Sequence, residues 1–182
     1  MNKAFFFDRD GTLIEEKNFI SNPDEVFLLP GVKETLKALK EKGFLIIVVT
    51  NQSGIARGLL TEEDMKRVNK RLNELLDGMI DDFFYCPHHP DITGVCKCRK
   101  PEIGMIDAAC EKFNLDISEC FMVGDKLSDV QTGKNAGMKQ SFLVMTGYGI
   151  EEYKKYSGKF EIYILNNISE ILERVKRSKV KS

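Results

Sequence analysis

The stretch KAFFFDRDGTL, residues 3–13, decides the fold of this chain. Its apolar residues form a short continuous run that ends in Asp8, and Asp10 and Gly11 follow. Continuous apolar runs of this length are typical of strands that are buried on both faces of a parallel sheet. Side chains two residues apart in a strand point the same way. The pattern over residues 3–8 therefore predicts two carboxylates together at the carboxyl end of a buried strand.

Further apolar runs of the same kind alternate with helical patterns along the chain. The expected strands are residues 44–51, 120–125, 141–146 and, as a weaker candidate, 161–165. The expected helices are residues 31–42, 61–77, 101–113, 128–136 and 168–177, the third of them with Pro101 at its first position. The alternation predicts an α/β fold, a doubly wound parallel sheet in one domain over residues 1–182, with residues 176–182 as a solvated charged end.

The composition narrows the class of protein and its partners. Hydrophobic residues make up 42% and charged residues 30%, the profile of a globular protein with a sizeable core, and the net charge of -1 argues against nucleic acid or a membrane surface as a partner. The apolar run before Asp8 is too short for a signal peptide or a membrane span, so a cytoplasmic location is expected. In that reducing compartment the cysteines are expected to be metal ligands or buried thiols rather than disulfides.

The residues that follow the strands are suited to phosphate chemistry, because ligands of such sheets bind at the carboxyl ends of the strands. Asp8 and Asp10 can divide the work, one attacking or holding a cation and the other exchanging a proton. Thr50 and its neighbours can cradle a phosphate, and Asp125 can complete a Mg²⁺ site with hard oxygen ligands. Taken singly, each feature has a plain alternative: solvated acids, ordinary turns or surface charges.

The cysteine-rich loop holds a candidate metal site. Cys86, His88, Cys96 and Cys98 are four soft ligands suited to tetrahedral Zn²⁺, although a loop with free thiols and surface histidines is the alternative. His89 could replace His88 as the fourth ligand. Four ligands leave no open position for water, so the zinc is expected to be structural and to fix a loop with little core of its own. The two remaining cysteines are expected to be core thiols.

Several strings occur together and in one order: DRDGTL (8–13), TNQSGIARG (50–58), CPHHP (86–90), CKCRKP (96–101), GM (104–105) and MVGDKLSD (122–129). In this combination the chain resembles the haloacid dehalogenase superfamily of phosphotransferases. Within the superfamily it resembles the heptose bisphosphate phosphatases, with the histidinol phosphatases as near relatives. The resemblance extends over residues 5–137 and implies a Rossmann-like fold without a large cap domain. It also favours His88 over His89 as the zinc ligand.

The resemblance implies a two-step phosphatase mechanism. Asp8 would be the nucleophile that forms an aspartyl-phosphate, and Asp10 would protonate the leaving alcohol and then take a proton from water. Mg²⁺ would be bound by Asp8, Asp125 and the backbone carbonyl of Asp10. Thr50 would hydrogen-bond the phosphoryl group, and Lys100 would balance its charge. Catalysis by positioning and charge neutralisation is what phosphoryl transfer requires.

The implied substrate is a small phosphorylated sugar, and the enzyme is expected to be a monomer. The implied reaction is hydrolysis of the C7 phosphate of D-glycero-D-manno-heptose 1,7-bisphosphate to heptose 1-phosphate, a step towards nucleotide-activated heptose and lipopolysaccharide. Histidinol phosphate or another small phosphomonoester is the alternative substrate, and a zinc-dependent binding module is the alternative class. The positions that match the family's substrate contacts are Glu16, Lys17, Asn18, Phe19, Thr50, Asn51, Gln52, Ser53, Arg99, Lys100 and Lys126. Two positions depart from the family pattern, since Glu16 stands where Asp is common and Asn18-Phe19 replaces a Gly-Tyr pair.

Overall fold

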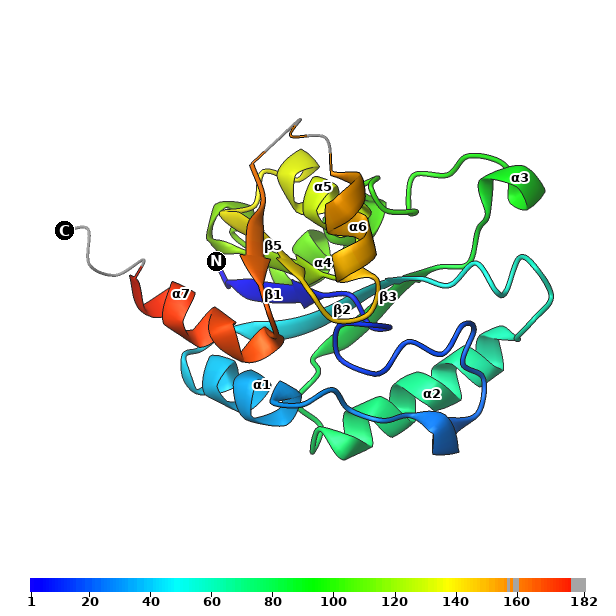
Figure 1. Cartoon of the computed structure of the whole chain (residues 1–182), viewed down its shortest axis with the longest axis horizontal. Helices are drawn as coiled ribbons and strands as arrows, with labels where there is room; N and C mark the ends of the chain where they lie inside the picture. Colours follow the sequence, from blue (N-terminus) through cyan, green and yellow to red (C-terminus); the bar gives the residue numbers. More distant parts are fainter. Residues whose placement is uncertain (157, 159–160, 178–182) are drawn as a thin grey trace.

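The computed structural model describes residues 1–156, 158 and 161–177, so residues 178–182 of the expected charged end lie outside the described residues. One sheet of six parallel strands runs through the molecule in the order β3-β2-β1-β4-β5-β6 (Figure 1). The strands are β1 (Ala4–Phe7), β2 (Leu45–Asn51), β3 (Asp82–Cys86), β4 (Phe121–Gly124), β5 (Gln140–Val144) and β6 (Tyr163–Leu165). The predicted parallel α/β sheet is confirmed.

Helices cover both faces of the sheet, as they do in doubly wound folds. On one face lie α1 (Val32–Glu41), α2 (Glu62–Leu75) and α7 (Ile171–Arg177), and on the other lie α4 (Gly104–Phe113) and α5 (Leu127–Asn135). The shorter elements are α3 (Pro90–Thr93), α6 (Gly149–Lys155) and the 3₁₀ turns η1 (Pro23–Glu25), η2 (Ile117–Glu119) and η3 (Ile168–Glu170). None of the helices in the described part of the chain has the length and apolar character that a membrane crossing needs.

Strand β1 places its phenylalanines alternately in the two layers of the core. Phe5 and Phe7 belong to the layer under α1 and α2, whereas Phe6 belongs to the layer under α4. Phe5 stacks on Phe121 of β4 with ring centroids 4.6 Å apart, and Phe44 meets it edge-on at 4.9 Å. Truncation of such a buried ring to alanine costs about 3–5 kcal/mol. The continuous apolar run is therefore explained by burial of the strand on both faces.

Strands β2 and β3 lie on one side of β1, whereas β4, β5 and β6 lie on the other. This change of side at β1 positions the site. Phe7 pairs with Val48 of β2 on one side and with Val123 of β4 on the other. The carboxyl ends of these three strands therefore meet at one edge, at the crevice where ligands of open α/β sheets bind. Asp8, Thr50 and Asp125 lie at these ends.

The capping residues confirm the second helix. Thr61 and Asp64 form a reciprocal capping box, since Asp64 N donates to Thr61 Oγ1 at 3.1 Å and Thr61 N donates to Asp64 Oδ2 at 2.9 Å. The expected start of the helix over residues 101–113 was wrong. Pro101 lies in a turn closed by Glu102 N donating to Arg99 O at 2.8 Å, and the helix begins only at Gly104. The turn directs the preceding Lys100 back to the strand ends.

The sequence patterns did not indicate β3, α3 or α6. Strand β3 lies at the edge of the sheet, and four of its five residues are only partly buried, so it lacks the fully apolar character of the inner strands. Between Asn51 and Lys100 the chain forms only α2, β3, α3 and loops. This leaves no space for a large cap domain, which confirms the expectation.

Candidate active site

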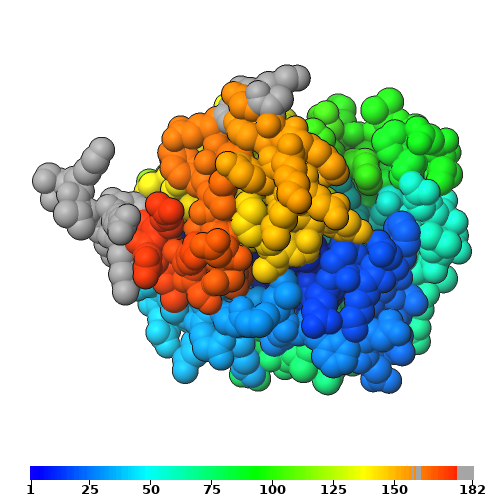
Figure 2. All heavy atoms as spheres, in the orientation of Figure 1, coloured from blue at the N-terminus to red at the C-terminus, as the bar shows by residue number. Residues whose placement is uncertain are grey.

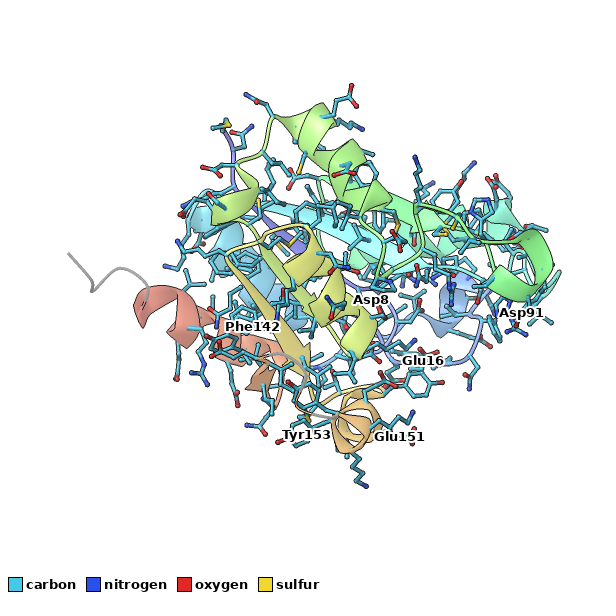
Figure 3. All side chains as sticks on the ribbon, turned by 90° about the horizontal axis from the view of Figure 1, so that it is seen from above. Asp8, Glu16, Asp91, Phe142, Glu151 and Tyr153 are labelled. Atoms are coloured by element: carbon cyan, nitrogen blue, oxygen red, sulfur yellow. The ribbon has the colours of Figure 1, made fainter. Side chains whose placement is uncertain are left out.

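A cavity of about 310 Å³ opens at the carboxyl ends of the central strands. Among the predicted site residues, those that line it are Asp8, Asp10, Glu16, Asn18, Phe19, Thr50, Asn51, Gln52, Ser53, Arg99, Lys100 and Lys126. Figure 3 places Asp8 near the middle of the molecule and Glu16 nearby, with Asp91 far away at the end of the cysteine loop. Residues from five separate segments of the sequence therefore meet in one cavity.

A buried lysine links two buried aspartates at the floor of the cavity. Lys100 Nζ lies 2.8 Å from Asp8 Oδ1 and 2.7 Å from Asp129 Oδ1, and it also donates to the Val49 carbonyl at 2.8 Å. Burial opposes ionisation of Asp8, but Lys100 and Lys126 together hold the pKa of the Asp8 carboxyl below its ordinary value. The Asp8 carboxylate is thus kept ionised, which is the state in which a carboxylate can attack as a nucleophile.

Asp125 has a free oxygen that faces a cluster of carboxylates. The residue is fully buried, its Oδ2 accepts from Tyr148 N at 2.8 Å, and its Oδ1 has no hydrogen-bond partner among the residues that the structure describes. Burial and the nearby Asp8 and Asp129 carboxylates raise the pKa of Asp125 to about 8. Carboxylate oxygens of these three aspartates lie within 4.8 Å of one another. An unpartnered buried oxygen among carboxylates is the donor set that a hard cation such as Mg²⁺ would satisfy.

Gly11 allows the loop after β1 to pass directly over Asp125. Its φ is +79°, a left-handed value that favours glycine, and a Cβ atom at this position would lie 2.2 Å from Asp125 Oδ2. Thr146 Oγ1 donates to the Gly11 carbonyl at 2.7 Å and fixes the loop from the β5 side. Any larger residue at position 11 would therefore have to displace the Asp125 carboxylate.

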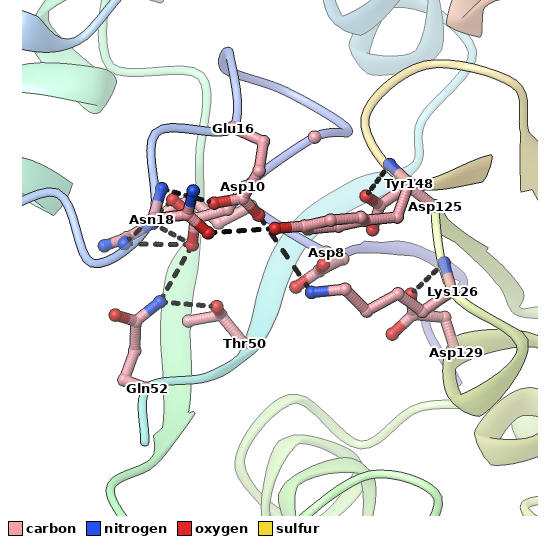
Figure 4. Close-up of polar contacts among 12 residues, drawn as sticks. Asp8, Asp10, Glu16, Asn18, Thr50, Gln52, Asp125, Lys126, Asp129 and Tyr148 are labelled. Carbon is pink, nitrogen blue, oxygen red and sulfur yellow. Dashed lines mark hydrogen bonds and ion pairs between the residues drawn. The ribbon is translucent and has the colours of Figure 1, made fainter. Parts of the chain in front are cut away.

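Asp10 lies beside Asp8 but accepts hydrogen bonds from a different set of donors (Figure 4). Arg9 donates to both of its oxygens, with Nε to Oδ2 and Nη2 to Oδ1 each at 3.1 Å. Gln52 Nε2 donates to Asp10 Oδ2 and to Thr50 Oγ1, both at 2.9 Å. Gln52 thus connects the Asp10 carboxylate to the hydroxyl at the end of β2.

The rim of the cavity joins the N-terminal loop to the segment before α6. Tyr148 Oη donates to Asn18 Oδ1 at 2.9 Å, and Lys126 Nζ lies 4.8 Å from the centre of the Tyr148 ring (Figure 4). Figure 2 shows these two segments, blue and yellow-orange, meeting on one face of the molecule. Burial and the Asp10 carboxylate raise the pKa of Glu16, whose Oε2 lies 4.0 Å from Lys126 Nζ.

Other predicted substrate contacts hold the protein chain itself or lie away from the cavity. Asn51 Oδ1 accepts from Lys100 N at 3.1 Å, so Asn51 fastens the backbone of the buried lysine. Arg99 lines the cavity while its Nη1 donates to the His88 carbonyl at 3.2 Å. Lys17 Nζ lies 4.1 Å from the centre of the Phe27 ring and is not among the described residues that line the cavity.

The four predicted zinc ligands come together in the loop that precedes Arg99. The sulfurs of Cys86, Cys96 and Cys98 and the imidazole of His88 lie within 4.8 Å of one another. His88 Nδ1 lies 3.2 Å from Cys98 Sγ and 3.6 Å from Cys86 Sγ. Three thiols and one imidazole form a donor set that suits tetrahedral Zn²⁺.

His89 has a different environment. Its Nε2 lies 2.7 Å from Arg57 Nη2, and its Nδ1 accepts from Asp91 N at 3.3 Å at the start of α3. Arg57 follows the predicted phosphate loop after β2, so this contact ties the cysteine loop to that segment.

Four residues that line the cavity were not assigned by sequence reasoning: Arg9, Ser128, Asp129 and Tyr148. Asp129 carried a signal, because it stands four residues after Asp125 in the same string, but its partner Lys100 lies far away in sequence. The alternation of a strand places Arg9 on the side opposite Asp8, so its return to Asp10 could not be read from the pattern. Tyr148 lies in a loop without a distinctive motif.

Comparisons with known proteins identify relatives of this chain. A family model described as polynucleotide kinase 3 phosphatase matches residues 3–142. The chain is 40% identical over 156 residues to the D-glycero-beta-D-manno-heptose-1,7-bisphosphate 7-phosphatase of Haemophilus ducreyi, covering 81% of this chain and 86% of that protein. It is 38% identical over 183 residues to the protein of the same name from Pasteurella multocida, covering 97% and 98% of the two chains.

A solved structure resembles the whole chain. The D,D-heptose 1,7-bisphosphate phosphatase from B. bronchiseptica, crystallised in complex with magnesium and phosphate, superposes with a TM-score of 0.87 at 29% identity and covers 98% of this chain and 99% of that one. The parallel sheet, the paired aspartates and the buried lysine thus define a phosphatase of the haloacid dehalogenase superfamily, of the small kind without a cap. Within it, the chain belongs to the family of D-glycero-D-manno-heptose-1,7-bisphosphate 7-phosphatases.

Proposed function

We propose that this chain is a Mg²⁺-dependent phosphatase that removes the C7 phosphate of D-glycero-β-D-manno-heptose 1,7-bisphosphate. The observation that carries the chemistry is Lys100 Nζ, held 2.8 Å from Asp8 and 2.7 Å from Asp129 at the floor of the cavity. A cavity of about 310 Å³ matches a small ligand. The named relatives support the heptose and its β anomer. The product, heptose 1-phosphate, would then be used to make nucleotide-activated heptose.

In the first step an oxygen of Asp8 attacks the phosphorus, and the bond from phosphorus to the sugar oxygen breaks. Asp10 donates its proton to that oxygen, so the sugar leaves as an alcohol and Asp8 carries the phosphoryl group. In the second step water attacks this phosphorus, Asp10 takes the water proton, and Asp8 is released as a carboxylate. In such a double displacement one residue can serve as the general acid of the first step and as the general base of the second.

Charge neutralisation supports both steps. Lys100 lies against the Asp8 carboxylate, where it would face the transferring phosphoryl group, and Thr50 offers its hydroxyl from the end of β2. We assign Mg²⁺ to Asp8, Asp125 and the backbone carbonyl of Asp10. Bound Mg²⁺ would supply positive charge to the phosphate oxygens.

The role of Asp129 follows from its contacts. It belongs to the same carboxylate cluster as Asp8 and Asp125, yet its two oxygens lie 2.7 Å from Lys100 Nζ and 3.0 Å from Lys126 N. Because Oδ1 forms an ion pair with Lys100 and Oδ2 accepts from Lys126 N, we assign Asp129 to the orientation of Lys100 rather than to the first ligands of the metal.

The sugar would be recognised at the rim of the cavity. One side of the rim is formed by Glu16, Asn18 and Phe19. Arg99 and Lys126 provide positive charge for a second anionic group on the substrate, which the Arg99 guanidinium would contact through two nitrogens. Gln52 and Asn51 are engaged with Asp10 and with Lys100, so we assign them to support of those residues.

The cysteine cluster is proposed as a structural Zn²⁺ site. Cys86, His88, Cys96 and Cys98 fill four positions, which leaves none for a reacting water. Cys98 directly precedes Arg99 and Lys100, so metal ligation would also fix these two cations. We further propose a single domain over residues 1–182 that acts as a monomer in the cytoplasm, where a reducing environment keeps these thiols available to the metal.

The experiment is a substrate panel measured as kcat/KM with Mg²⁺. It compares the α and β anomers of the heptose 1,7-bisphosphate, histidinol phosphate and an oligonucleotide with a 3′-phosphate, the last because of the family model's description. The β anomer is expected to be hydrolysed best, with phosphate lost from C7 as shown by ³¹P NMR of the product. Preference for histidinol phosphate or for the oligonucleotide would overturn the proposal.

A further inference from the structure

Arg9 lies between Asp8 and Asp10 in the sequence, and its long side chain is only 1% exposed. A buried guanidinium must be paired, since an uncompensated charge in the interior is strongly destabilising. Arg9 is paired with Asp10 through two of its nitrogens, since Nε donates to Oδ2 and Nη2 donates to Oδ1, each at 3.1 Å, and Nη2 also lies 3.0 Å from Oδ2. A two-point contact between a planar fork and a carboxylate fixes the plane of the carboxylate as well as its position.

The third nitrogen of Arg9 is held by helix α2. Arg9 Nη1 donates to Asn69 Oδ1 at 2.9 Å, and Asn69 is itself only 6% exposed. Asn69 Nδ2 points to Met65 Sδ at 3.0 Å, which sets the orientation of the amide so that its oxygen faces Arg9. A neutral acceptor satisfies the guanidinium without competing with Asp10 for its charge.

The hydrogen bonds distinguish the two oxygens of Asp10. Oδ2 accepts from Arg9 Nε and from Gln52 Nε2, which uses both of its lone pairs. Among the described residues, Oδ1 accepts only from Arg9 Nη2. Oδ1 therefore keeps one lone pair for a proton that can be exchanged with the substrate or with water.

We propose that Asn69 and Arg9 are positioning residues for proton transfer, and that Asp10 Oδ1 is the atom that carries the transferred proton. Asn69 orients the Arg9 fork, and the fork sets the direction in which Oδ1 faces the leaving oxygen. When Asp10 gives its proton to the sugar oxygen as the bond to phosphorus breaks, the fork stabilises the carboxylate that remains. The inference rests on the proposed function, in which Asp10 is the general acid.

The leaving group of the substrate separates this role from a purely structural one. The primary alkoxide of an alkyl phosphate is a poor leaving group and needs the proton, whereas p-nitrophenolate leaves as a stable anion and does not. The comparison uses kcat/KM for the heptose bisphosphate and for p-nitrophenyl phosphate, because this parameter reports the steps up to formation of the phosphoenzyme. Loss of general acid catalysis lowers only the first of the two.

The decisive variant is Asn69→Ala, and Asn73→Ala is its matched control. Asn73 lies one turn further along α2, where its Oδ1 accepts from Ile80 N at 3.0 Å. Asn69→Ala is expected to lower kcat/KM for the heptose bisphosphate about 10-fold, the lower part of the range for general acid catalysis, and for p-nitrophenyl phosphate by no more than about twofold. Asn73→Ala is expected to leave the ratio of the two values unchanged. An equal loss on both substrates in Asn69→Ala, or no loss on either, would overturn the inference.

Two further measurements keep the outcome decisive. Arg9→Lys keeps the positive charge but not the fork and is expected to show the same selective loss, whereas Asn69→Gln keeps a neutral amide acceptor on a longer side chain and is expected to lose less than Asn69→Ala. If Asn69→Ala does not fold, a wild-type ratio in Arg9→Lys overturns the inference instead. If the wild-type enzyme does not hydrolyse the heptose bisphosphate, the proposed function fails alone, and glycerol phosphate takes its place as the alkyl substrate.

Discussion

Lys100 Nζ lies 2.8 Å from Asp8 Oδ1, and both side chains are almost completely buried. The lysine and the aspartate are 92 residues apart in sequence and meet because β1 and the turn before α4 end at the same edge of the sheet. Burial opposes the charge of Lys100, but Asp129 and Asp8 raise its pKa above the ordinary value, so the lysine stays a cation. The pair is part of the folded core, and in the proposed mechanism it also neutralises the charge of the phosphoryl group.

Replacement of the lysine should therefore affect stability and activity together. Lys100→Met leaves the Asp8 and Asp129 carboxylates without their cation, and breaking a buried pair in this way costs about 3–5 kcal/mol of unfolding free energy. Activity is expected to fall by at least about 10²-fold, since the phosphoryl group loses its neutralising partner. Urea unfolding and steady-state kinetics measure the two effects.

The double variant Lys100→Met with Asp129→Asn separates the effect on stability from the effect on activity. Removal of one orphaned charge should recover part of the stability and none of the activity. Recovery of activity in the double variant would contradict the role of Lys100.

Replacement of Asp8, the proposed nucleophile, should affect activity alone. Asp8→Asn keeps the shape of the side chain and an acceptor for Lys100, but it removes the anion that attacks phosphorus, so turnover is expected to fall by about 10³-fold or more. The thermal midpoint should stay within a few degrees of wild type, because Asp8 also repels the buried Asp125. Phosphate release and thermal melts of the purified variant measure both quantities, and near-normal turnover would refute the assignment.

The stability of the metal-free protein should depend on pH through Asp125. Burial and the neighbouring carboxylates raise the pKa of Asp125 from the ordinary 3.8 of an aspartate to about 8. Between these values the native state keeps a proton that the unfolded chain has released, so the free energy of unfolding falls as pH rises towards 8. Urea unfolding in EDTA at a series of pH values between 6 and 8.5 measures the slope.

Mg²⁺ should reverse this trend, because it binds the ionised carboxylates of the native state. The stabilisation by added Mg²⁺ is expected to be larger at pH 8.5 than at pH 6, and Mg²⁺ should restore activity after EDTA treatment that leaves the zinc in place. Asp125→Asn should remove both the pH slope and the response to Mg²⁺. A metal-free stability that rises with pH across this range would count against the proposed charge arrangement.

The cysteine cluster should hold zinc and stabilise its loop. Cys98→Ser removes one of the four ligands and is expected to lower the zinc content from about one per chain, the thermal midpoint by about 5 °C or more, and activity through displacement of Arg99 and Lys100. Cys110→Ser is the matched control, since Cys110 lies in α4 outside the cluster. An unchanged melting point, zinc content and rate in Cys98→Ser would show that metal does not hold the loop.

The rim contact should affect substrate binding more than chemistry. Tyr148→Phe keeps the ring over Lys126 but loses the hydrogen bond to Asn18, which is worth about 1 kcal/mol. KM for the heptose bisphosphate is expected to rise about fivefold, while kcat stays within about twofold. Tyr153→Phe, on the exposed side of α6, is the control. Kinetics that do not differ between the two variants would remove Tyr148 from the recognition of the sugar.

The inner strands and the aspartates that follow them could be predicted because their signals are local. An apolar run such as residues 44–51 needs no partner to be recognised, and the capping box at Thr61 is complete within four residues. The edge strand β3 was missed because its residues are half-exposed, and Pro101 was misplaced because the turn around it depends on the position of Lys100. The four cysteine-loop ligands were found together because they lie within thirteen residues of one another.

The sequence by itself determined which chemical groups this protein has and which strand ends they follow, since strand burial and the order of motifs are properties of short segments. Only the tertiary structure decided which groups act on one another. Asp129 with Lys100, Arg9 with Asn69 and Tyr148 with Asn18 are pairs between distant segments. Hydrogen bonds and ion pairs fall off within a few ångströms, so these pairings exist only once packing of the helices on the sheet has fixed the positions of both partners.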